Sequence, residues 1–127
     1  MKRRILIIDD EEGIRDLYRL ELENEGYDVF TAPGSKEALR ILKNEGVDLV
    51  ILDIRLKGEN GLELLQKMSG SHPQIPVIIS SAYSSYRSDF SSWLAEGYVV
   101  KSTETGELLE EVKKVLRKFY PKGRKKV

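Results

Sequence analysis

The amino-acid sequence predicts an α/β domain in which helices cover both faces of a parallel β-sheet. Short apolar runs alternate along the chain with segments of helical periodicity, as in repeated βα units. The apolar runs have no polar residue in their middle, which is typical of strands buried on both faces of a sheet. A length of 127 residues suits one domain with one core.

Five apolar runs are predicted to be strands. In chain order they read RILIID, YDVFTA, DLVILD, PVIISS and GYVVKS. Glycines and prolines mark the joints between these strands and the helices, at Gly26, Gly46, Pro73, Pro76 and Gly97. We therefore expect one domain over residues 1–120, followed by a basic flexible tail over residues 121–127.

Five helices are expected, beginning near Glu12, Ser35, Gly61, Ser84 and Glu104. The last has acidic residues early and basic residues late, as the helix dipole favours. The fourth is rich in serine, which lowers helix propensity. An aromatic stripe at helical spacing nevertheless runs through it, formed by Tyr83, Tyr86, Phe90 and Trp93. We therefore predict that packing of its side chains stabilises the fourth helix, and that it is the most mobile of the five.

The composition excludes several classes of protein. Lys plus Arg and Asp plus Glu both number 21, so no net charge draws the whole molecule to nucleic acid or to a membrane. The absence of cysteine excludes disulfides and thiolate metal sites. The apolar run after MKRR is too short for a signal peptide, and no stretch approaches a membrane span. We expect a cytoplasmic protein with no direct binding to nucleic acid or membranes.

Polar residues at the carboxyl ends of the strands predict a shared site. The first strand ends in Asp9 and Asp10, the third in Asp53, the fourth in Ser81 and the fifth in Lys101. Ligands of open α/β sheets bind at this edge. Neighbouring carboxylates repel one another, so they call for a cation, and oxygen ligands of this kind suit Mg²⁺. The hydroxyl and the ammonium can bind phosphoryl oxygens, and an aspartate can act as the nucleophile.

The charged residues of this set also have structural interpretations. Asp9 or Asp10 could cap the helix that follows, and Asp53 could be a turn residue after a buried strand. Lys101 could be a surface lysine. The functional interpretation rests on the set of residues that the strands bring together.

Four motifs in order, IIDDE, VILDIRLKGENGLELL, VIISSAY and YVVKS, resemble those of response-regulator receiver domains of two-component signalling, of the chemotaxis-receiver type. The resemblance extends from about Arg4 to Tyr120. It implies a flavodoxin-like, doubly wound sheet of five parallel strands in the order 2-1-3-4-5, with five helices.

The resemblance assigns a role to each residue of the strand-end set. It implies that Asp53 is the phosphoacceptor, that Ser81 binds one phosphoryl oxygen and that Lys101 pairs with another. It also implies that Mg²⁺ is held by Asp9 and Asp10, with Asp10 the direct ligand, together with Asp53.

Three further residues take roles from the same resemblance. The backbone carbonyl of Arg55 would complete the Mg²⁺ ligands. Tyr98 lies where the family has a switch aromatic that turns inward on activation. The side chains of Arg55 and Tyr83 would flank the path of the water that attacks the phosphoryl group. Because both are large, we expect them to slow dephosphorylation and to give a long-lived phosphoryl form.

Two positions depart from the family pattern. Lys57 and Ser102 both stand where prolines are usual. The missing proline at Lys57 predicts a looser loop after the acceptor strand. A cis peptide bond is costly without proline, so the Lys101–Ser102 bond is predicted to be trans.

The sequence thus predicts a stand-alone receiver, not a classical enzyme, that supports its own Mg²⁺-dependent phosphorylation and dephosphorylation. A sensor histidine kinase would phosphorylate Asp53, and a target protein would read the face formed by the fourth helix, fifth strand and fifth helix. We expect a monomer or a weak dimer on phosphorylation. Alternatives are a phosphorelay intermediate that serves a histidine phosphotransfer protein, and a receiver fragment of a larger regulator. An aspartate-nucleophile, Mg²⁺-dependent phosphatase is disfavoured, because its second aspartate would fall at Arg55.

Overall fold

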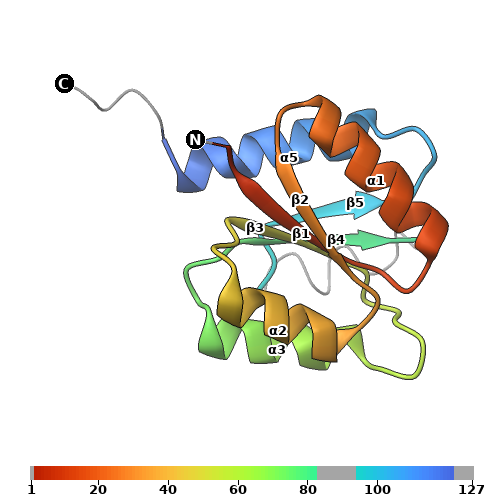
Figure 1. The fold of residues 1–127 in the computed structure, drawn as a ribbon, viewed down its shortest axis with the longest axis vertical. Coiled ribbons are helices and arrows are strands. Elements are labelled where there is room, and N and C mark those ends of the chain that lie inside the picture. Colours follow the sequence, from red (N-terminus) through yellow and green to blue (C-terminus); the bar gives the residue numbers. More distant parts are fainter. Residues whose placement is uncertain (1, 83–93, 122–127) are drawn as a thin grey trace.

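A five-stranded parallel sheet forms the centre of the computed structural model, which describes residues 2–82 and 94–121 (Figure 1). Its strands are β1 (Arg4–Ile8), β2 (Asp28–Ala32), β3 (Leu49–Leu52), β4 (Val77–Ser81) and β5 (Gly97–Val100). They lie in the order β2-β1-β3-β4-β5, and every neighbouring pair is parallel. This confirms the flavodoxin-like order predicted from the sequence.

Four helices of the described residues cover the two faces of the sheet. Helices α1 (Glu12–Asn24) and α5 (Gly106–Phe119) lie on one face, and α2 (Ser35–Asn44) and α3 (Gly61–Ser71) lie on the other (Figure 1). The helix predicted to begin near Ser84 falls within residues 83–93, outside the described residues. The basic tail is outside them as well, apart from Pro121.

The core has two layers because successive strand residues face opposite sides of the sheet. In β1, Leu6 and Ile8 pack toward α2 and α3, whereas Ile5 and Ile7 pack toward α1 and α5. All four side chains are fully buried. Burial on both faces explains why the strands read as continuous apolar runs.

Helix α5 begins at Gly106, two residues later than predicted from the sequence. The Ser102 hydroxyl accepts a hydrogen bond from the Glu104 N–H at 3.0 Å, so Ser102 and Glu104 form a turn that precedes the helix. Thr105 is then the N-cap. The described residues contain no cis peptide bond, which confirms the predicted trans bond between Lys101 and Ser102.

A close backbone contact joins the two ends of the loop between β3 and α3. A Cβ atom at Gly61 would lie 2.4 Å from the Ile54 Cα, a distance that no side chain can occupy. The Gly61 N–H donates a hydrogen bond to the Ile54 carbonyl at 3.1 Å. Gly58 has a φ of 69°, which glycine adopts without steric cost. Two glycines therefore shape the turn that follows Asp53.

Side chains of the same loop cap two helices. Asn60 Oδ1 accepts a hydrogen bond from the Leu62 N–H at 2.9 Å at the start of α3. Glu59 Oε1 accepts one from the Ser35 N–H at 2.9 Å at the start of α2. The loop is thus connected to both helices on its face of the sheet, in a region where Lys57 replaces the expected proline.

No helix within the described parts of the chain has the length and apolar character needed to cross a membrane.

Candidate functional site

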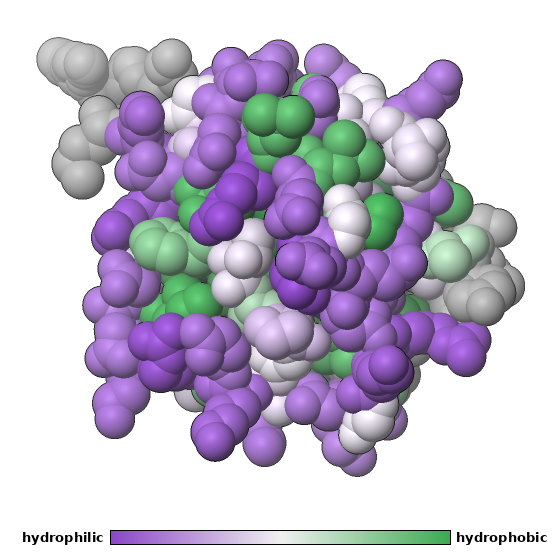
Figure 2. Space-filling model, turned by 45° about the vertical axis from the view of Figure 1, so that its right-hand side comes forward, coloured by the Kyte–Doolittle hydropathy of each residue, from purple (hydrophilic) through white to green (hydrophobic). Residues whose placement is uncertain are grey.

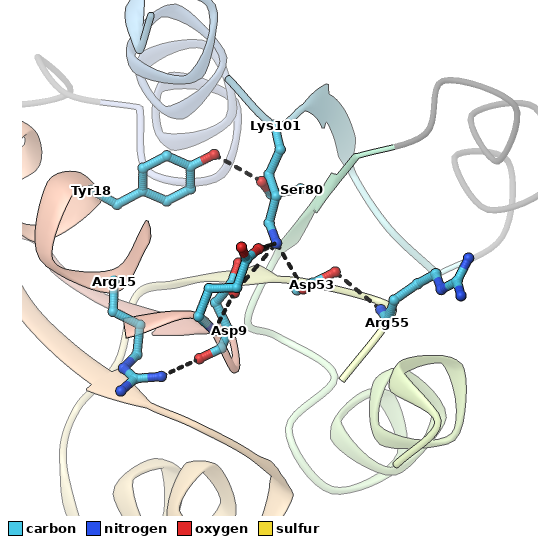
Figure 3. A network of polar contacts seen from close by, with 8 residues as sticks. Asp9, Arg15, Tyr18, Asp53, Arg55, Ser80 and Lys101 are labelled. Atoms are coloured by element: carbon cyan, nitrogen blue, oxygen red, sulfur yellow. Dashed lines mark hydrogen bonds and ion pairs between the residues drawn. The ribbon is translucent and has the colours of Figure 1, made fainter. Parts of the chain in front are cut away.

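Three charged residues, each just after a different strand, meet at the carboxyl edge of the sheet (Figure 3). Asp9 follows β1, Asp53 follows β3 and Lys101 follows β5. The parallel order of β1, β3, β4 and β5 brings these strand ends to one edge. Asp9 is 1% exposed and Asp53 is 3% exposed, so both carboxylates are buried although neither belongs to a strand.

The ammonium group of Lys101 contacts three carboxylates. Its Nζ lies 2.9 Å from Asp53 Oδ2, 3.1 Å from Asp9 Oδ2 and 2.6 Å from Glu11 Oε1. The side chain of Lys101 is only 10% exposed, whereas that of Glu11 is 61% exposed. One buried cation therefore balances part of the charge of three acids. This excludes the interpretation of Lys101 as an ordinary surface lysine.

Burial raises the pKa of Asp9 to about 6, and the nearby charge of Asp53 adds to this effect. A hydrogen bond from the Glu11 N–H and the contact with Lys101 act in the opposite direction. Burial also disfavours the charged form of Lys101, but its hydrogen bonds to Glu11, Asp53 and Asp9 raise its pKa above the ordinary value. Asp9 therefore bears a negative charge at neutral pH that its neighbours compensate only in part, and Lys101 stays protonated.

The two buried aspartates bind nearby backbone amides. Asp9 Oδ1 accepts a hydrogen bond from the Glu11 N–H at 2.9 Å, and Asp53 Oδ1 accepts one from the Arg55 N–H at 3.0 Å. The guanidinium of Arg15 donates to the Asp9 carbonyl at 2.7 Å. Helix α1 has no side-chain hydrogen bond at its N-cap, Glu11. Asp9 is thus fixed in a turn before the helix and does not serve as its cap.

Four carboxylates at this edge could hold a metal ion. Asp9, Asp10, Glu11 and Asp53 each offer one oxygen, and these oxygens lie within 4.8 Å of one another. Mg²⁺ prefers oxygen ligands and binds through one or two carboxylates together with water and phosphate oxygens. The donor atoms are of the right kind, and their charge exceeds what Lys101 can balance. The residues present therefore fit a Mg²⁺ ion.

A cavity of about 260 Å³ adjoins these acids. It is lined by Asp10, Glu11, Asp53, Arg55, Ala82 and Lys101. Its walls thus include both acidic side chains and the ammonium. A phosphoryl group bound there would lie beside both Lys101 and the acidic cluster.

The structure places Ser81 at this edge and Tyr98 three residues before Lys101, in the core. Ser81 is the last residue of β4 and is fully buried. Its carbonyl accepts a hydrogen bond from the Lys101 N–H at 2.6 Å. Tyr98 lies in β5 opposite Ile79 and is 6% exposed, with its side chain in the core layer of α2 and α3. Ser81 is therefore joined through the backbone to Lys101, which lines the cavity.

Of the two residues predicted to slow dephosphorylation, the structure describes Arg55 but not Tyr83. The backbone of Arg55 is bound to Asp53, but its exposed guanidinium points away from Asp53 (Figure 3). Tyr83 lies outside the described residues.

Sequence reasoning missed two features of the site. Glu11 stands in the acidic run, but only the fold shows that it contacts Lys101. Tyr18 of α1 is hydrogen-bonded to Ser80 of β4, with 3.0 Å between Tyr18 Oη and Ser80 Oγ (Figure 3). A tyrosine on the apolar face of a helix reads as core packing, so nothing in the sequence distinguishes its hydroxyl.

The surface near the carboxyl edge is largely hydrophilic. Figure 2, which brings the right-hand side of Figure 1 forward, shows charged and polar side chains over most of this view, with apolar residues in small groups. A second, more open groove of about 860 Å³ runs along the loop after β3, from Asp10 to Leu62. Hydrophilic side chains therefore cover most of this view of the molecule.

Comparison with known proteins assigns the chain to a family. The family model of the response regulator receiver domain matches residues 5–113. The chain is similar to the response regulator protein TrrA from Thermotoga maritima, whose crystal structure contains Mg²⁺-BeF. The identity is 47%, the TM-score is 0.83, and the match covers 90% of this chain and 99% of that one.

Two further crystal structures are similar to the structure of this chain. A CheY-like response regulator receiver domain protein from Methanospirillum hungatei is 35% identical, with a TM-score of 0.87 and coverage of 97% of this chain and 100% of that one. TrrA in complex with the histidine kinase ThkA matches at 47% identity and a TM-score of 0.81, over 90% of this chain and 98% of that one. The predicted family is thereby confirmed, and the chain belongs to the response regulator receiver domains.

Proposed function

We propose that this chain is a stand-alone response regulator that accepts a phosphoryl group on Asp53 from a partner histidine kinase. The phosphorylated form then binds a target protein. The observation that carries the proposal is the buried contact of 2.9 Å between Lys101 Nζ and Asp53 Oδ2, beside an acidic cluster that fits Mg²⁺. A nucleophilic carboxylate, a cation for phosphoryl oxygens and metal ligands thus lie in one site.

In the proposed transfer, an Asp53 carboxylate oxygen attacks the phosphorus of a phosphohistidine. The new P–O bond forms as the P–N bond breaks, and the histidine nitrogen takes the electron pair of the broken bond. Lys101 is placed to follow the new charge, because its ammonium already lies against Asp53. A bound Mg²⁺, held by Asp9, Asp10, Asp53 and the Arg55 carbonyl, would supply positive charge to the phosphoryl oxygens.

Hydrolysis would return the protein to its starting state. A water molecule attacks the phosphorus, the bond to the Asp53 oxygen breaks, and inorganic phosphate leaves. The Asp53 carboxylate is regenerated. In-line attack needs a water molecule opposite the leaving oxygen, so the lifetime of the signal depends on the access of water to the phosphorus.

The relatives support the partner and the metal of this proposal. The complex of TrrA with the kinase ThkA supports a histidine kinase as phosphoryl donor, and the Mg²⁺-BeF complex of TrrA supports Mg²⁺ as the ion. Both of these relatives, TrrA and the Methanospirillum protein, are matched over almost their whole length. We propose that this chain acts in the cytoplasm.

Phosphorylation with a small donor tests the proposal directly. Incubation with acetyl phosphate and Mg²⁺ should add one phosphoryl group to the wild-type protein, detected by intact-protein mass. Asp53→Asn should abolish the addition, whereas Asp28→Asn should leave it unchanged, because Asp28 lies at the opposite end of β2. Undiminished labelling of Asp53→Asn would falsify the assignment of the phosphoacceptor.

A transfer assay separates an effector from a relay. Phosphorylated protein is mixed with a histidine phosphotransfer domain, and the label is followed on both proteins. Retention of the label on Asp53 together with tighter binding of a target supports the proposal. Rapid movement of the label to histidine would assign the protein to a phosphorelay instead.

A further inference from the structure

The hydrogen bond between Tyr18 and Ser80 joins two elements that carry different parts of the proposed site. Tyr18 lies in α1, the helix that follows Asp9 and Asp10, and Ser80 precedes Ser81 at the end of β4. The two hydroxyl oxygens are 3.0 Å apart, although 62 positions separate the residues in the sequence. Tyr18 and Ser80 are each 1% exposed.

This polar pair lies in an apolar layer of the core. Tyr18 packs with Ile7, Ile51 and Ile78 in the layer beneath α1 and α5. Burial raises the pKa of the Tyr18 phenol above its ordinary value, so the hydroxyl remains protonated at neutral pH. A buried hydroxyl without a hydrogen-bond partner destabilises the folded state. The hydrogen bond between the two hydroxyl groups therefore stabilises both of them in this apolar layer.

The end of β4 extends past its pairing with β3. The pairing of β3 with β4 ends at Leu52 and Ile79, whereas β4 continues to pair with β5 through Ser81. Ser80 and Ser81 thus extend past the ladder with β3, toward the cavity lined by Ala82. The hydroxyl of Tyr18 reaches this extension from the face covered by α1.

We propose that Tyr18 is a positioning residue that sets the place of the Ser81 hydroxyl relative to the acidic cluster. Its hydrogen bond fixes Ser80, and because Ser80 precedes Ser81 in the strand, the Ser81 backbone is fixed with it. The helix that follows Asp9 and Asp10 is thereby tied to the strand that delivers the phosphoryl-binding hydroxyl. This inference rests on the proposed function, because it assumes that Ser81 binds the phosphoryl group.

Separate measurements of Mg²⁺ and beryllofluoride binding test the proposal, since only the latter depends on Ser81. Tyr18→Phe keeps the ring and removes the hydroxyl. We expect it to weaken beryllofluoride binding in saturating Mg²⁺ by about 3- to 10-fold, the worth of one hydrogen bond. Mg²⁺ affinity without beryllofluoride should change less than about two-fold, because the acidic cluster is intact. Ser80→Ala should reproduce both results.

The double variant Tyr18→Phe/Ser80→Ala separates positioning from stability. Removing both hydroxyls leaves no unpaired buried group, so the double variant should be at least as stable as either single variant. Its beryllofluoride affinity should nevertheless remain as low as that of the single variants. Recovery of wild-type affinity in the double variant would reduce Tyr18 to a stability role and overturn the proposal.

Tyr120→Phe is the matched control. It removes a tyrosine hydroxyl that donates to the Asp48 carbonyl at 2.9 Å, just before β3 begins and therefore at the opposite edge of the sheet. It should leave beryllofluoride affinity unchanged. If Tyr18→Phe also binds beryllofluoride like the wild type, the positioning role is wrong and the proposed function stands. If the wild type itself fails to bind beryllofluoride, the proposed function fails.

Discussion

The Lys101 ammonium lies 2.9 Å from Asp53 Oδ2, across 48 positions of sequence, with both side chains almost fully buried. The same ammonium contacts Asp9 at 3.1 Å. In the absence of a metal ion, Lys101 is therefore the main compensation for two buried carboxylates. Lys101 and Mg²⁺ are thus both expected to neutralise the carboxylates of Asp9 and Asp53.

Replacing Lys101 with methionine should destabilise the metal-free protein. Loss of one partner of a buried ion pair costs about 3–5 kcal/mol, because the remaining charge is left unpaired. Urea denaturation in EDTA should show this loss, and added Mg²⁺ should restore most of it. Lys118→Met is the control, since the Lys118 side chain is 71% exposed and its ion pair with Glu96 is a surface one. A Lys101→Met protein as stable as Lys118→Met in EDTA would contradict this prediction.

The raised pKa of Asp9 predicts a pH-dependent stability. Because the folded pKa is about 6 and the ordinary value is 3.8, the native state binds this proton more tightly than the unfolded chain does. The stabilising contribution is therefore complete below pH 3.8 and is lost as the pH rises through about 6. Asp9→Asn should be more stable than the wild type at pH 7.5 without metal, by an amount on the order of 1–3 kcal/mol.

The advantage of Asp9→Asn should shrink as the pH falls toward 4.5, where the wild-type carboxyl is also neutral. Thermal melts at both pH values in EDTA measure the difference. Asp28→Asn, at an exposed surface position, controls for the general effect of removing an acid. An equal gain for Asp9→Asn at both pH values would show that its ionisation is not the cause.

Asp10→Asn should weaken Mg²⁺ binding roughly ten-fold, because an amide oxygen lacks the charge of the carboxylate. Glu12→Gln provides a matched control, since Glu12 belongs to the same acidic run but not to the four-carboxylate cluster. Isothermal titration of the metal-free proteins with Mg²⁺ measures both affinities. Unchanged affinity in Asp10→Asn would place the metal elsewhere.

Much of this site could be predicted because strand order and strand ends follow from simple patterns. A buried strand comes directly before each of Asp9, Asp53 and Lys101. Because these strands are parallel and close to one another in the sheet, the three residues lie at the same edge. The contact of Glu11 with Lys101 could not be predicted, since it depends on how the first turn of α1 is oriented. The same holds for Glu59, which caps α2 from a loop 24 positions away. Such contacts depend on tertiary geometry that no local pattern encodes.

Small side chains at positions 55 and 83 should accelerate dephosphorylation. In-line attack needs a water molecule opposite the leaving Asp53 oxygen, and bulky neighbours can obstruct it. The guanidinium of Arg55 points away from Asp53, so any shielding by Arg55 requires it to swing back over the phosphoryl group (Figure 3). Arg55→Ala/Tyr83→Ala should therefore lose phosphate faster than the wild type. Lys57→Ala is the control, because Lys57 lines the same groove after β3 as Arg55 does. An unchanged rate in the double variant would exclude shielding.

The surface that changes on phosphorylation should lie around β5. A phosphoryl group adds about −1.5 to −2 charges at Asp53 and attracts Ser81 and Lys101, which border the segment 83–93 and the end of β5. Tyr98, three residues before Lys101, should report the change. Hydrogen exchange with and without beryllofluoride should show altered protection over residues 82–102 and the start of α5. If altered protection is confined to α1 and α2 while residues 82–102 stay unchanged, the output lies on another face and Tyr98 is only a packed strand residue.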